Sequence, residues 1–277
     1  MTDRYAVIGN PVAHSKSPAI HAAFARQCGQ DLTYEAILAP PDGFRAAAEA
    51  FRQAGGRGLN VTAPFKLEAL ELADRPTERA RRAGAANTLR FDTRDEGGIF
   101  ADNTDGIGLV RDIRDRLGFP LSGRRILIVG AGGAARGVVL PLLDESPALL
   151  AIANRSADKA EALKIQFAPH DTLGALAVGG FDDFAGGGFD LVINATSASL
   201  GAASLRLPAG LFAAGALAYD MVYGRGETPF LRDARAQGAA RGADGLGMLV
   251  AQAAESFFLW RGLRPDTAPV LALLQGG

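Results

Sequence analysis

The stretch Arg125–Gly137, with the sequence RILIVGAGGAARG, decides the fold. Residues 125–129 have the apolar pattern of a buried strand, and a turn with the pattern G-x-G-x-x-A follows at 130–135. Glycine permits a tight turn and lets the backbone approach a pyrophosphate, while the next helix presents free N–H groups to negative charge. The stretch predicts a dinucleotide-binding α/β unit, with a glycine-rich turn that binds nothing as the alternative. The predicted phosphate loop is Gly130, Ala131, Gly132, Gly133 and Ala134.

The end of the next strand indicates which dinucleotide is bound. A strand expected at 149–153 ends at Asn154, Arg155 and Ser156, and Lys159 follows about one helical turn later. A unit that binds NAD usually has Asp or Glu here, which accepts a hydrogen bond from the ribose 2′-hydroxyl. Two cations instead favour the 2′-phosphate of NADP. We therefore predict NADP as the cofactor, with an arginine that is merely solvated at a helix start as the alternative.

Strands and helices alternate along the rest of the chain. The expected strands are 5–8, 34–38, 59–62, 88–91, 98–101, 149–153, 191–194 and 217–221. The expected helices are 17–28, with Ser17 as N-cap, then 42–54, 64–73, 78–82, 105–117, 156–167, 229–237 and 246–260, besides the one after the glycine-rich turn. This alternation predicts an α/β protein with parallel strand pairing.

Composition excludes several classes of protein. The 277 residues are 48% apolar and 21% charged, with a net charge of −1, so we expect no nucleic-acid or membrane partner. One cysteine cannot form an internal disulfide, and the three histidines lack metal-ligand spacing, so no metal is expected. We recognise neither a signal peptide nor an apolar run of about 18–20 residues. The expected location is the cytoplasm.

Two polar segments follow predicted strands of the first hundred residues. Ser15 and Ser17 lie at a helix N-terminus, which suits a small carboxylate, although Ser17 could simply cap that helix. Asn60 and Thr62 lie where a strand ends, and Lys66 lies in the first turn of the next helix. Only 4 of the 29 Lys and Arg residues are lysines, so a retained lysine suggests acid–base work that arginine cannot do. The alternative is a solvated surface lysine.

A third segment, Asn103-Thr104-Asp105-Gly106, offers a carboxylate. Asp105 could orient a lysine and accept a substrate hydroxyl, or it could cap the helix that it opens. Asp102 is the nearest competitor, and we rank it lower. Asn87 lies upstream in Ala86-Asn87-Thr88, and Gln252 stands out as an amide in an otherwise apolar helix. A buried amide would need hydrogen-bond partners, and an exposed helix face is the alternative.

These segments, in this order, resemble the shikimate dehydrogenase family along essentially the whole chain. The matching motifs are GNPVAHSKSP (9–18), NVTAPFK (60–66), GAANTL (84–89), DNTDG (102–106), GAGGAARG (130–137), NRS (154–156), NATS (194–197), DMVYG (220–224) and DGLGMLVAQA (244–253). The resemblance implies a reversible, NADPH-dependent reduction of 3-dehydroshikimate to shikimate. It also implies two domains, an N-terminal α/β substrate domain and a Rossmann-type doubly wound NADP domain, with C-terminal helices that return to the first. The expected bounds are 1–104 plus 245–277 and 105–244.

The resemblance also implies roles for individual residues. Lys66 and Asp105 match the catalytic pair, Lys66 moving the proton at the substrate oxygen and Asp105 holding that oxygen and the lysine. The residues that match substrate-binding positions are Ser15, Ser17, Asn60, Thr62, Asn87, Tyr223 and Gln252. The residues that match cofactor-binding positions are Glu78, Gly130, Ala131, Gly132, Gly133, Ala134, Asn154, Arg155, Ser156, Lys159, Thr196, Met221 and Gly245. A monomer or a homodimer is expected.

Two departures from the family pattern are small. Ala63 occupies a position that often holds a larger aliphatic residue, and residues 198–201 form an altered segment after NATS. Two other functions stay open. One is a quinate/shikimate dehydrogenase that uses NAD, against which Arg155 argues. The other is a non-catalytic NADP-binding regulatory protein, against which the intact Lys66 and Asp105 argue.

Overall fold

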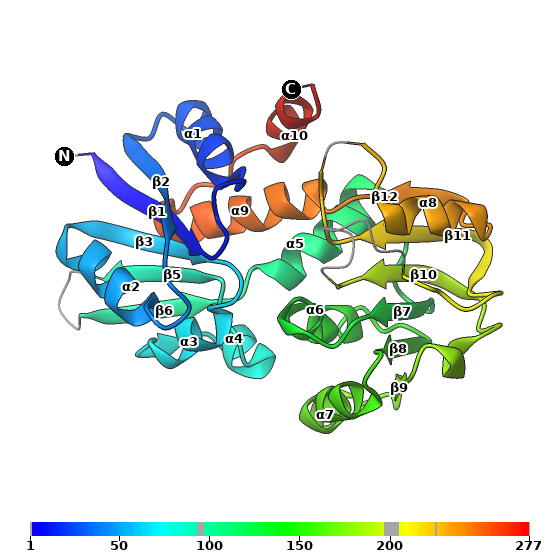
Figure 1. The fold of residues 1–277 in the computed structure, drawn as a ribbon. Helices are drawn as coiled ribbons and strands as arrows, with labels where there is room; N and C mark the ends of the chain where they lie inside the picture. The colour runs from blue at the N-terminus through cyan, green and yellow to red at the C-terminus, as the bar shows by residue number, and fades with distance from the viewer. Residues whose placement is uncertain (1, 93–96, 197–204, 225, 277) are drawn as a thin grey trace. The chain divides into compact units, whose positions relative to one another are not determined.

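The computed structural model describes residues 2–92, 97–196, 205–224 and 226–276 (Figure 1). The chain divides into two compact units, of which the first comprises Met1–Gly108 with Leu249–Gly277 and the second Leu109–Met248. The chain passes between the units inside two helices, α5 (Asp105–Arg111) and α9 (Leu246–Arg261). Within the described residues, no helix combines the length and the apolar character that a membrane span requires.

The first unit is built on a six-stranded sheet in the order β2-β1-β3-β5-β6-β4. Its strands are β1 (Asp3–Gly9), β2 (Leu32–Leu38), β3 (Gly56–Val61), β4 (Arg75–Pro76), β5 (Thr88–Asp92) and β6 (Gly98–Asp102). Its other helices are α1 (Ser17–Gln27), α2 (Phe44–Gln53), α3 (Lys66–Glu71), α4 (Glu78–Ala83) and α10 (Thr267–Gln275). β1 pairs in parallel with β2 and β3, as expected, but β5 pairs antiparallel with both β3 and β6. The parallel pairing expected for 88–91 and 98–101 is wrong, because a parallel pair needs a crossover of about a dozen residues.

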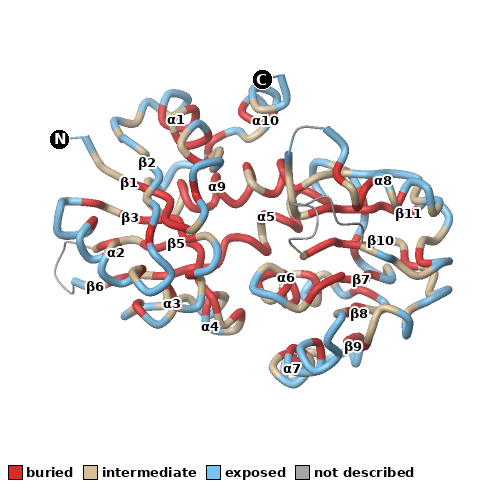
Figure 2. Tube along the Cα trace, in the orientation of Figure 1, coloured by how far each residue is buried: buried red, intermediate tan, exposed pale blue. Residues whose placement is uncertain are grey.

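Side chains of β1 and β3 alternate between the two faces of this sheet. One buried cluster joins residues of α2 and α3 to Ala6, Ile8, Leu59 and Val61. The intervening residues face the other way, since Tyr5 stacks on Trp260 of α9 and the Asn60 amide donates to Ser256 of the same helix. The strands in the middle of the sheet are therefore buried along most of their length (Figure 2). The alternation turns Asn60 toward α9.

An aromatic group surrounds His21 of α1 on the α9 side of the sheet. The His21 ring stacks on Tyr34 with centroids 4.3 Å apart, and its centroid lies 5.3 Å from that of Trp260. His21 is fully buried, and burial lowers its pKa from 6.5 to about 3. The imidazole is therefore neutral in the folded protein at neutral pH.

We expect this buried imidazole to make the first unit sensitive to acid. The unfolded chain binds a proton at His21 near the ordinary pKa and the folded chain does not, so the free energy of unfolding falls as the pH drops below that value. The loss from this residue between pH 7 and pH 5 is about 2 kcal/mol. The substitution His21→Phe keeps an aromatic ring but no titratable group, so it should abolish this loss of unfolding free energy between pH 7 and pH 5. Urea unfolding at both pH values, followed by Trp260 fluorescence, measures the effect.

The control for this prediction is His14→Phe, because His14 is exposed. It should leave the pH dependence of the unfolding free energy as in the wild type. An equal pH dependence in His21→Phe and the wild type would contradict the prediction.

The second unit contains a six-stranded sheet in the order β12-β11-β10-β7-β8-β9, with every pairing parallel. Its strands are β7 (Arg125–Val129), β8 (Leu149–Ala153), β9 (Leu176–Gly179), β10 (Phe189–Asn194), β11 (Phe212–Asp220) and β12 (Arg241–Ala243). Its other helices are α6 (Gly133–Leu143), α7 (Ala157–Phe167) and α8 (Pro229–Ala236). The chain builds outward from β7 on one side and then from β10 on the other, which is the doubly wound Rossmann order. The predicted fold class is confirmed.

Several short elements escape sequence-based prediction. β4, β9 and β12 contain 2, 4 and 3 residues, too few to show an alternating pattern. α10 is apolar on most positions and docks on α1, where Gln27 Nε2 donates to Asp266 O at 3.2 Å. The helix expected at 64–73 begins instead at Lys66, and the helix expected at 42–54 begins at Phe44.

The helix expected at 105–117 changes its winding at Asp112. Its first part, α5, is α-helical, and Asp112–Arg116 is a π-helical turn. The buried Asp112 carboxylate accepts from the Tyr219 hydroxyl at 2.6 Å and pairs with Arg116. A Cβ at Gly247 would lie 1.9 Å from Asp112 Oδ1, so this position of α9 requires glycine. The π-helical turn thus begins at a residue that makes a polar contact inside the second unit.

Candidate active site

The predicted polar residues of the first unit meet at one edge of its sheet. Because β5 is antiparallel to β3 and β6, the carboxyl ends of β3 and β6 lie at the same edge as the amino end of β5. Lys66 follows β3, Asp105 follows β6, and Asn87 directly precedes β5. The Asn87 N–H donates to Asp102 O at 3.0 Å, and Asn87 O accepts from Val61 N at 2.8 Å. The backbone of Asn87 is therefore fixed between the ends of β6 and β3.

Lys66 and Asp105 form a short ion pair, with Nζ 2.6 Å from Oδ2. Their side chains are only 21% and 11% exposed, so Lys66 is not a solvated surface lysine. Asp105 is the first residue of α5, and its other carboxylate oxygen, Oδ1, accepts from Asn87 Nδ2 at 2.9 Å. The carboxylate is thus held at both oxygens, and it can hold the lysine ammonium in one place.

Backbone groups fix the orientation of the Asn87 and Gln252 amides. The Thr104 N–H can only donate, and it lies 2.8 Å from the Asn87 atom assigned as Oδ1. The Leu249 carbonyl can only accept, and it lies 2.8 Å from the Gln252 atom assigned as Nε2. Gln252 Oε1 then accepts from Asn87 Nδ2 at 3.2 Å. Gln252 is 8% exposed, so the exposed helix face that we kept as an alternative is wrong.

The Asn60 amide is also held by hydrogen bonds at both its nitrogen and its oxygen. Its Nδ2 lies 3.2 Å from the Asn87 carbonyl, 3.2 Å from Thr88 Oγ1 and 3.0 Å from Ser256 Oγ. Its Oδ1 accepts from the Tyr34 hydroxyl at 2.7 Å. Burial raises the pKa of Tyr34, so this hydroxyl keeps its proton and acts as the donor. Two amide protons face three protein acceptors, which leaves Asn60 only a carbonyl lone pair to offer a ligand.

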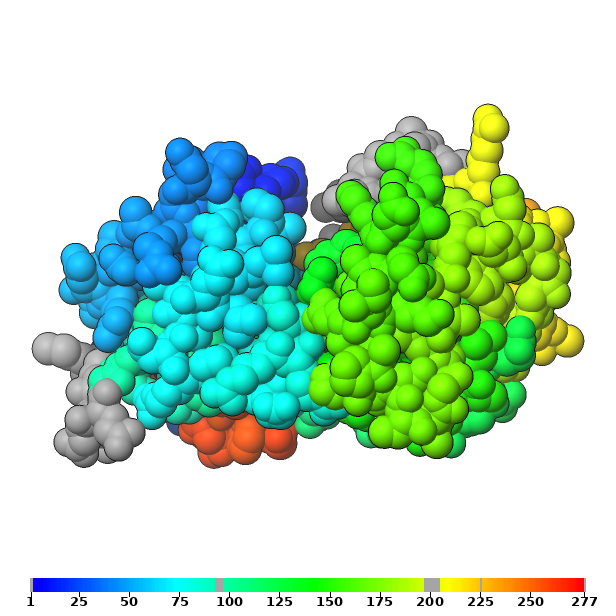
Figure 3. Space-filling view, turned by 90° about the horizontal axis from the view of Figure 1, so that it is seen from below, coloured from blue at the N-terminus to red at the C-terminus, as the bar shows by residue number. Residues whose placement is uncertain are grey.

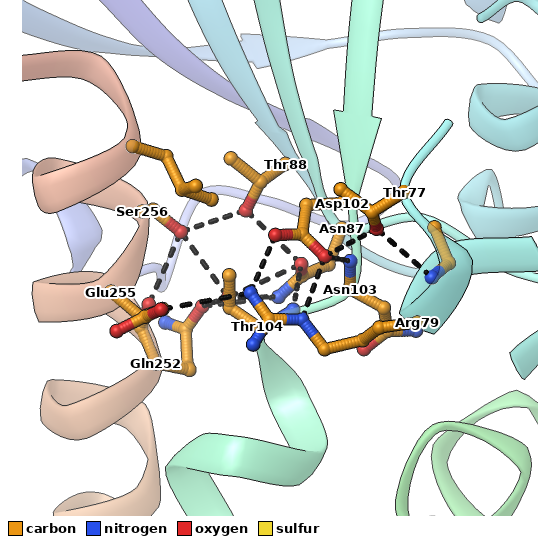
Figure 4. A network of polar contacts seen from close by, with 12 residues as sticks. Thr77, Arg79, Asn87, Thr88, Asp102, Asn103, Thr104, Gln252, Glu255 and Ser256 are labelled. Atoms are coloured by element: carbon orange, nitrogen blue, oxygen red, sulfur yellow. Dashed lines mark hydrogen bonds and ion pairs between the residues drawn. The ribbon is translucent and has the colours of Figure 1, made fainter. Parts of the chain in front are cut away.

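Asp102 belongs to a charged group beside this network (Figure 4). Arg79 of α4 donates from Nε to Asp102 Oδ1 at 2.8 Å and also from Nη2 to Oδ2, while Thr77 Oγ1 donates to Oδ1 at 2.8 Å. Arg79 Nη2 also lies 3.6 Å from Oε1 of Glu255 in α9, and Glu255 Oε2 accepts from Arg264 at 2.6 Å. Asp102 is therefore committed to Arg79, whereas Asp105 faces Lys66.

The two serines lie after β1, at the same sheet edge. α1 begins at Ser17, and Lys16, with near-helical backbone angles, occupies the N-cap position without a side-chain cap. The predicted cap role of Ser17 is wrong, because a capping residue must precede the first helical residue. Ser15 Oγ instead lies 3.3 Å from the Ser17 N–H, which donates to it. Thr62 lies alongside, with its N–H donating to Ile8 O at 2.9 Å.

Glu78 stands apart from this polar network. It is the first residue of α4, its side chain is 73% exposed, and Oε2 lies 4.0 Å from Arg81 Nη1. α3 and α4 form part of the surface of the first unit, and their residues are cyan in Figure 3.

The glycine-rich turn of the second unit fits a dinucleotide phosphate. Gly130 has φ +111°, and a Cβ there would lie 2.8 Å from Thr196 Cγ2, so the turn and the end of β10 require glycine. At Gly132 and Gly133 a Cβ would meet no heavy atom of the described chain within 4 Å. α6 begins at Gly133 and points its free N–H groups into this open space. Backbone donors without side chains in front of them are what a pyrophosphate needs.

The predicted adenosine-phosphate residues lie at the end of β8. Asn154 Nδ2 donates to Ser156 O at 2.9 Å, which shapes the turn into α7. Arg155 and Lys159 are both exposed, and neither forms an ion pair with any residue that the structure describes. Two unpaired cations at a helix start fit a phosphate monoester.

Three further predicted residues lie at the ends of β10 and β11. Thr196 Oγ1 donates to Asn194 Oδ1 at 2.7 Å. A Cβ at Gly245 would lie 2.2 Å from the Met221 carbonyl, so these two residues are in direct contact. Tyr223 follows in the second unit, whereas Ser15 and Ser17 belong to the first. The altered segment 198–201 lies outside the described residues, as does Ser197 of the NATS motif.

Sequence reasoning missed the groups that hold the predicted site residues. They are Tyr34, Arg79, Thr88, Thr104, Glu255 and Ser256. Thr88 and Thr104 lie inside the GAANTL and DNTDG motifs, next to residues that were named. Ser256 lies four residues after Gln252, so helical spacing places both on one side of α9. Tyr34 and Arg79 carry no local signal.

Comparison with known proteins agrees with this arrangement. Family models match at residues 7–89 (shikimate dehydrogenase substrate binding domain), 113–201 (shikimate / quinate 5-dehydrogenase) and 245–275 (shikimate 5'-dehydrogenase C-terminal domain). A shikimate dehydrogenase (NADP(+)) of Aromatoleum aromaticum is 64% identical over 99% of this chain and 97% of its own. The crystal structure of an Ael1 enzyme from Pseudomonas putida is 53% identical, with TM-score 0.90 and coverage of 99% and 98%. The shikimate 5-dehydrogenase of Thermus thermophilus, solved in complex with NADP(H) and shikimate, is 35% identical, with TM-score 0.85 and coverage of 98% of each chain.

The fold and these matches define an oxidoreductase with an α/β substrate unit and a Rossmann-type dinucleotide unit. The chain belongs to the shikimate dehydrogenase family.

Proposed function

We propose that this chain catalyses the reversible, NADPH-dependent reduction of 3-dehydroshikimate to shikimate, a step of chorismate and aromatic amino-acid biosynthesis. The observation that carries the proposal is the half-buried Lys66–Asp105 pair at the sheet edge where the other polar residues of the first unit converge. Relatives of 64% and 65% identity over 99% of the chain carry this activity in their names. Reduction of a ketone needs a hydride at carbon, which NADPH supplies when bound, and a proton at oxygen.

The proton is the part of this chemistry that the first unit performs. Lys66 Nζ donates a proton to the carbonyl oxygen during reduction and removes it from the hydroxyl during oxidation. Asp105 keeps the lysine in place and accepts a hydrogen bond from the same substrate hydroxyl. Asn87 supports Asp105 at the second oxygen, 2.9 Å away.

The remaining polar residues suit a polyhydroxy acid. Ser15, Ser17 and Tyr223 bind the carboxylate, with hydroxyl donors and the start of α1. Thr62 and Asn87 take ring hydroxyls, and Asn60 contributes as an acceptor through Oδ1. Gln252 Nε2 carries a second proton besides the one that goes to Leu249 O, and it donates that proton to a ring hydroxyl.

The second unit would hold NADP through its strand ends. Because all its strands are parallel, the segments after β7, β8, β10 and β11 lie at one edge. The residues in these proposed contacts are Gly130, Ala131, Gly132, Gly133 and Ala134 for the pyrophosphate, Asn154, Arg155, Ser156 and Lys159 for the adenosine phosphate, and Thr196, Met221 and Gly245 near the nicotinamide. Glu78 of the first unit completes the proposed set.

Nicotinamide absorbance on mixing the purified protein with shikimate and NADP tests this function. NAD and quinate run in parallel. Reduction only with shikimate and NADP supports the proposal. Comparable reduction with NAD or quinate would favour a quinate/shikimate dehydrogenase. No reduction with any pair would favour a non-catalytic NADP-binding protein.

Arg155→Asp is expected to change cofactor choice. Charge-assisted hydrogen bonds to a phosphate are worth roughly 1.5–3 kcal/mol, so the Kd for NADP should rise by about 10–100-fold while the Kd for NAD changes little. Calorimetric titration of each cofactor measures both constants. Arg232→Asp, an exposed position in α8, is the control and should leave both Kd values unchanged. Equal losses for the two cofactors would contradict a 2′-phosphate contact at Arg155.

The proposal includes the cellular location and the oligomeric state of the chain. We propose that the chain acts in the cytoplasm, as a monomer or a homodimer. Light scattering on the purified chain gives the oligomeric state.

A further inference from the structure

Two hydroxyls that the sequence did not single out lie next to the Asn87 amide (Figure 4). Thr88 is the first residue of β5, Ser256 lies in α9, and both are 0% exposed. Their oxygens are 2.7 Å apart, and Thr88 Oγ1 lies 3.0 Å from Asn87 Oδ1. Ser256 Oγ also lies 3.2 Å from Thr104 Oγ1. The two hydroxyls connect α9 to the start of β5.

The direction of the hydrogen bonds follows from groups that can only donate or only accept. Asn60 Nδ2 is a donor, so it gives its protons to the oxygens near it, which include Thr88 Oγ1 and Ser256 Oγ. Asn87 Oδ1 is an acceptor, because the Thr104 N–H donates to it at 2.8 Å. Thr88 therefore accepts from its neighbours and gives its own proton to Asn87 Oδ1. With its oxygen held in this way, the Asn87 amide turns its nitrogen to Asp105 Oδ1.

We propose that Thr88 and Ser256 are positioning residues: Thr88, supported by Ser256, acts together with the Thr104 N–H to hold the Asn87 amide in the orientation that keeps the Asp105 carboxylate beside Lys66. The inference rests on the proposed function, because it assigns the two hydroxyls a part in the same reaction. Neither hydroxyl touches the substrate, since both are buried among protein groups. Ser256 connects α9 to the Lys66–Asp105 pair indirectly, through Thr88 and Asn87.

The expected effect on the rate follows from the hydrogen bonds that remain when the Thr88 hydroxyl is removed. Without the Thr88 hydroxyl, Asn87 Oδ1 keeps the Thr104 N–H, and Asn60 Nδ2 keeps Asn87 O and Ser256 Oγ but loses one acceptor. The Asn87 amide then has one hydrogen bond fewer at Oδ1, so its position beside Asp105 is less closely fixed. A small misplacement of a catalytic group can lower the rate about 100-fold. Thr88 acts on Asp105 only through Asn87, so we expect the loss of its hydroxyl to lower the rate about tenfold.

The experiment compares variants that differ only in the hydroxyl. Thr88→Val keeps the shape and removes the hydroxyl, Thr88→Ser keeps the hydroxyl, and Ser256→Ala removes the second hydroxyl. Thr33→Val, an exposed position in β2, is the matched control. With NADP and shikimate, Thr88→Val and Ser256→Ala should lower kcat about tenfold, with KM within about threefold. Thr88→Ser and Thr33→Val should stay near the wild type in both constants.

A double-mutant cycle with Asn87→Ala separates positioning from general destabilisation. If Thr88 acts through Asn87, adding Thr88→Val to Asn87→Ala should lower kcat no further than about twofold. Losses that multiply would overturn the proposal, and so would a Thr88→Val enzyme with wild-type kcat. If Thr88→Val fails to fold, the same cycle with Ser256→Ala decides. A wild type that turns over no shikimate overturns the proposed function and this inference together, whereas an active wild type with unaffected variants overturns the inference alone.

Discussion

Replacing Lys66 by alanine is expected to lower kcat by about 10²–10⁴-fold with little change in KM for shikimate. The reason is that the Nζ atom, 2.6 Å from Asp105 Oδ2, is the group proposed to move the proton in the chemical step rather than only to bind the substrate. Water would have to replace it as proton donor, without the fixed position that Asp105 gives the ammonium. Initial rates of NADP reduction over a range of shikimate concentrations give kcat and KM separately.

Lys164→Ala provides the control for this measurement. Lys164 lies in α7 of the second unit and has no proposed role, so its removal should leave kcat and KM unchanged. If Lys66→Ala kept the wild-type kcat and only raised KM, Lys66 would be a binding residue, and another group would have to move the proton.

Replacing Arg79 by alanine is expected to lower the free energy of unfolding of the first unit by about 2–4 kcal/mol. Arg79 pairs with Asp102 and Glu255, whose side chains are 1% and 6% exposed. Removing one partner of a buried pair leaves an uncompensated charge, which costs about 3–5 kcal/mol. The range is lower here because Arg79 is itself 33% exposed and Glu255 keeps Arg264.

Urea unfolding followed by the fluorescence of Trp260 measures this loss. Trp260 is the single tryptophan of the chain, and it stacks on Tyr5 in the first unit. Arg81→Ala is the matched control in the same helix, because Arg81 is 59% exposed and only 4.0 Å from the exposed Glu78. We expect its effect to stay within about 0.5 kcal/mol. Equal effects of the two substitutions would show that the buried carboxylates do not depend on Arg79.

Sequence reasoning is strongest where a function depends on a few neighbouring residues. The loop Gly130–Ala134 was identified because the strand before it and the helix after it are read from the same short stretch. Lys66, expected in the first turn of a helix, and Asp105, expected to open one, are predicted as site residues because each follows a strand within a distinctive motif. That they form a pair, 39 residues apart in sequence, was implied by the resemblance and not by spacing.

Sequence reasoning fails where a residue depends on distant parts of the chain. Ser256 contacts Asn60 across 196 residues, and nothing near Ser256 in sequence shows that an amide lies there. The antiparallel β5–β6 pair is not predicted, although β5 ends at Asp92 and β6 begins at Gly98, and so few residues are too short for the crossover that a parallel pair needs. The π-helical turn begins at Asp112, whose carboxylate accepts a hydrogen bond from Tyr219, 107 residues away in sequence. In each case tertiary contacts overrode the local pattern.

The discontinuous first unit has a consequence for the order of events during synthesis. Residues 109–248 form a unit of their own between the two segments of the first. Domains generally fold as they leave the ribosome, so the Rossmann sheet can be complete while the catalytic sheet still lacks α9. Gln252, Ser256 and Glu255 are made after the whole second unit, and they complete the polar network around Asn87 and Asp102. A nascent chain can thus complete its Rossmann sheet before the residues of α9 support Asn87 and Asp102.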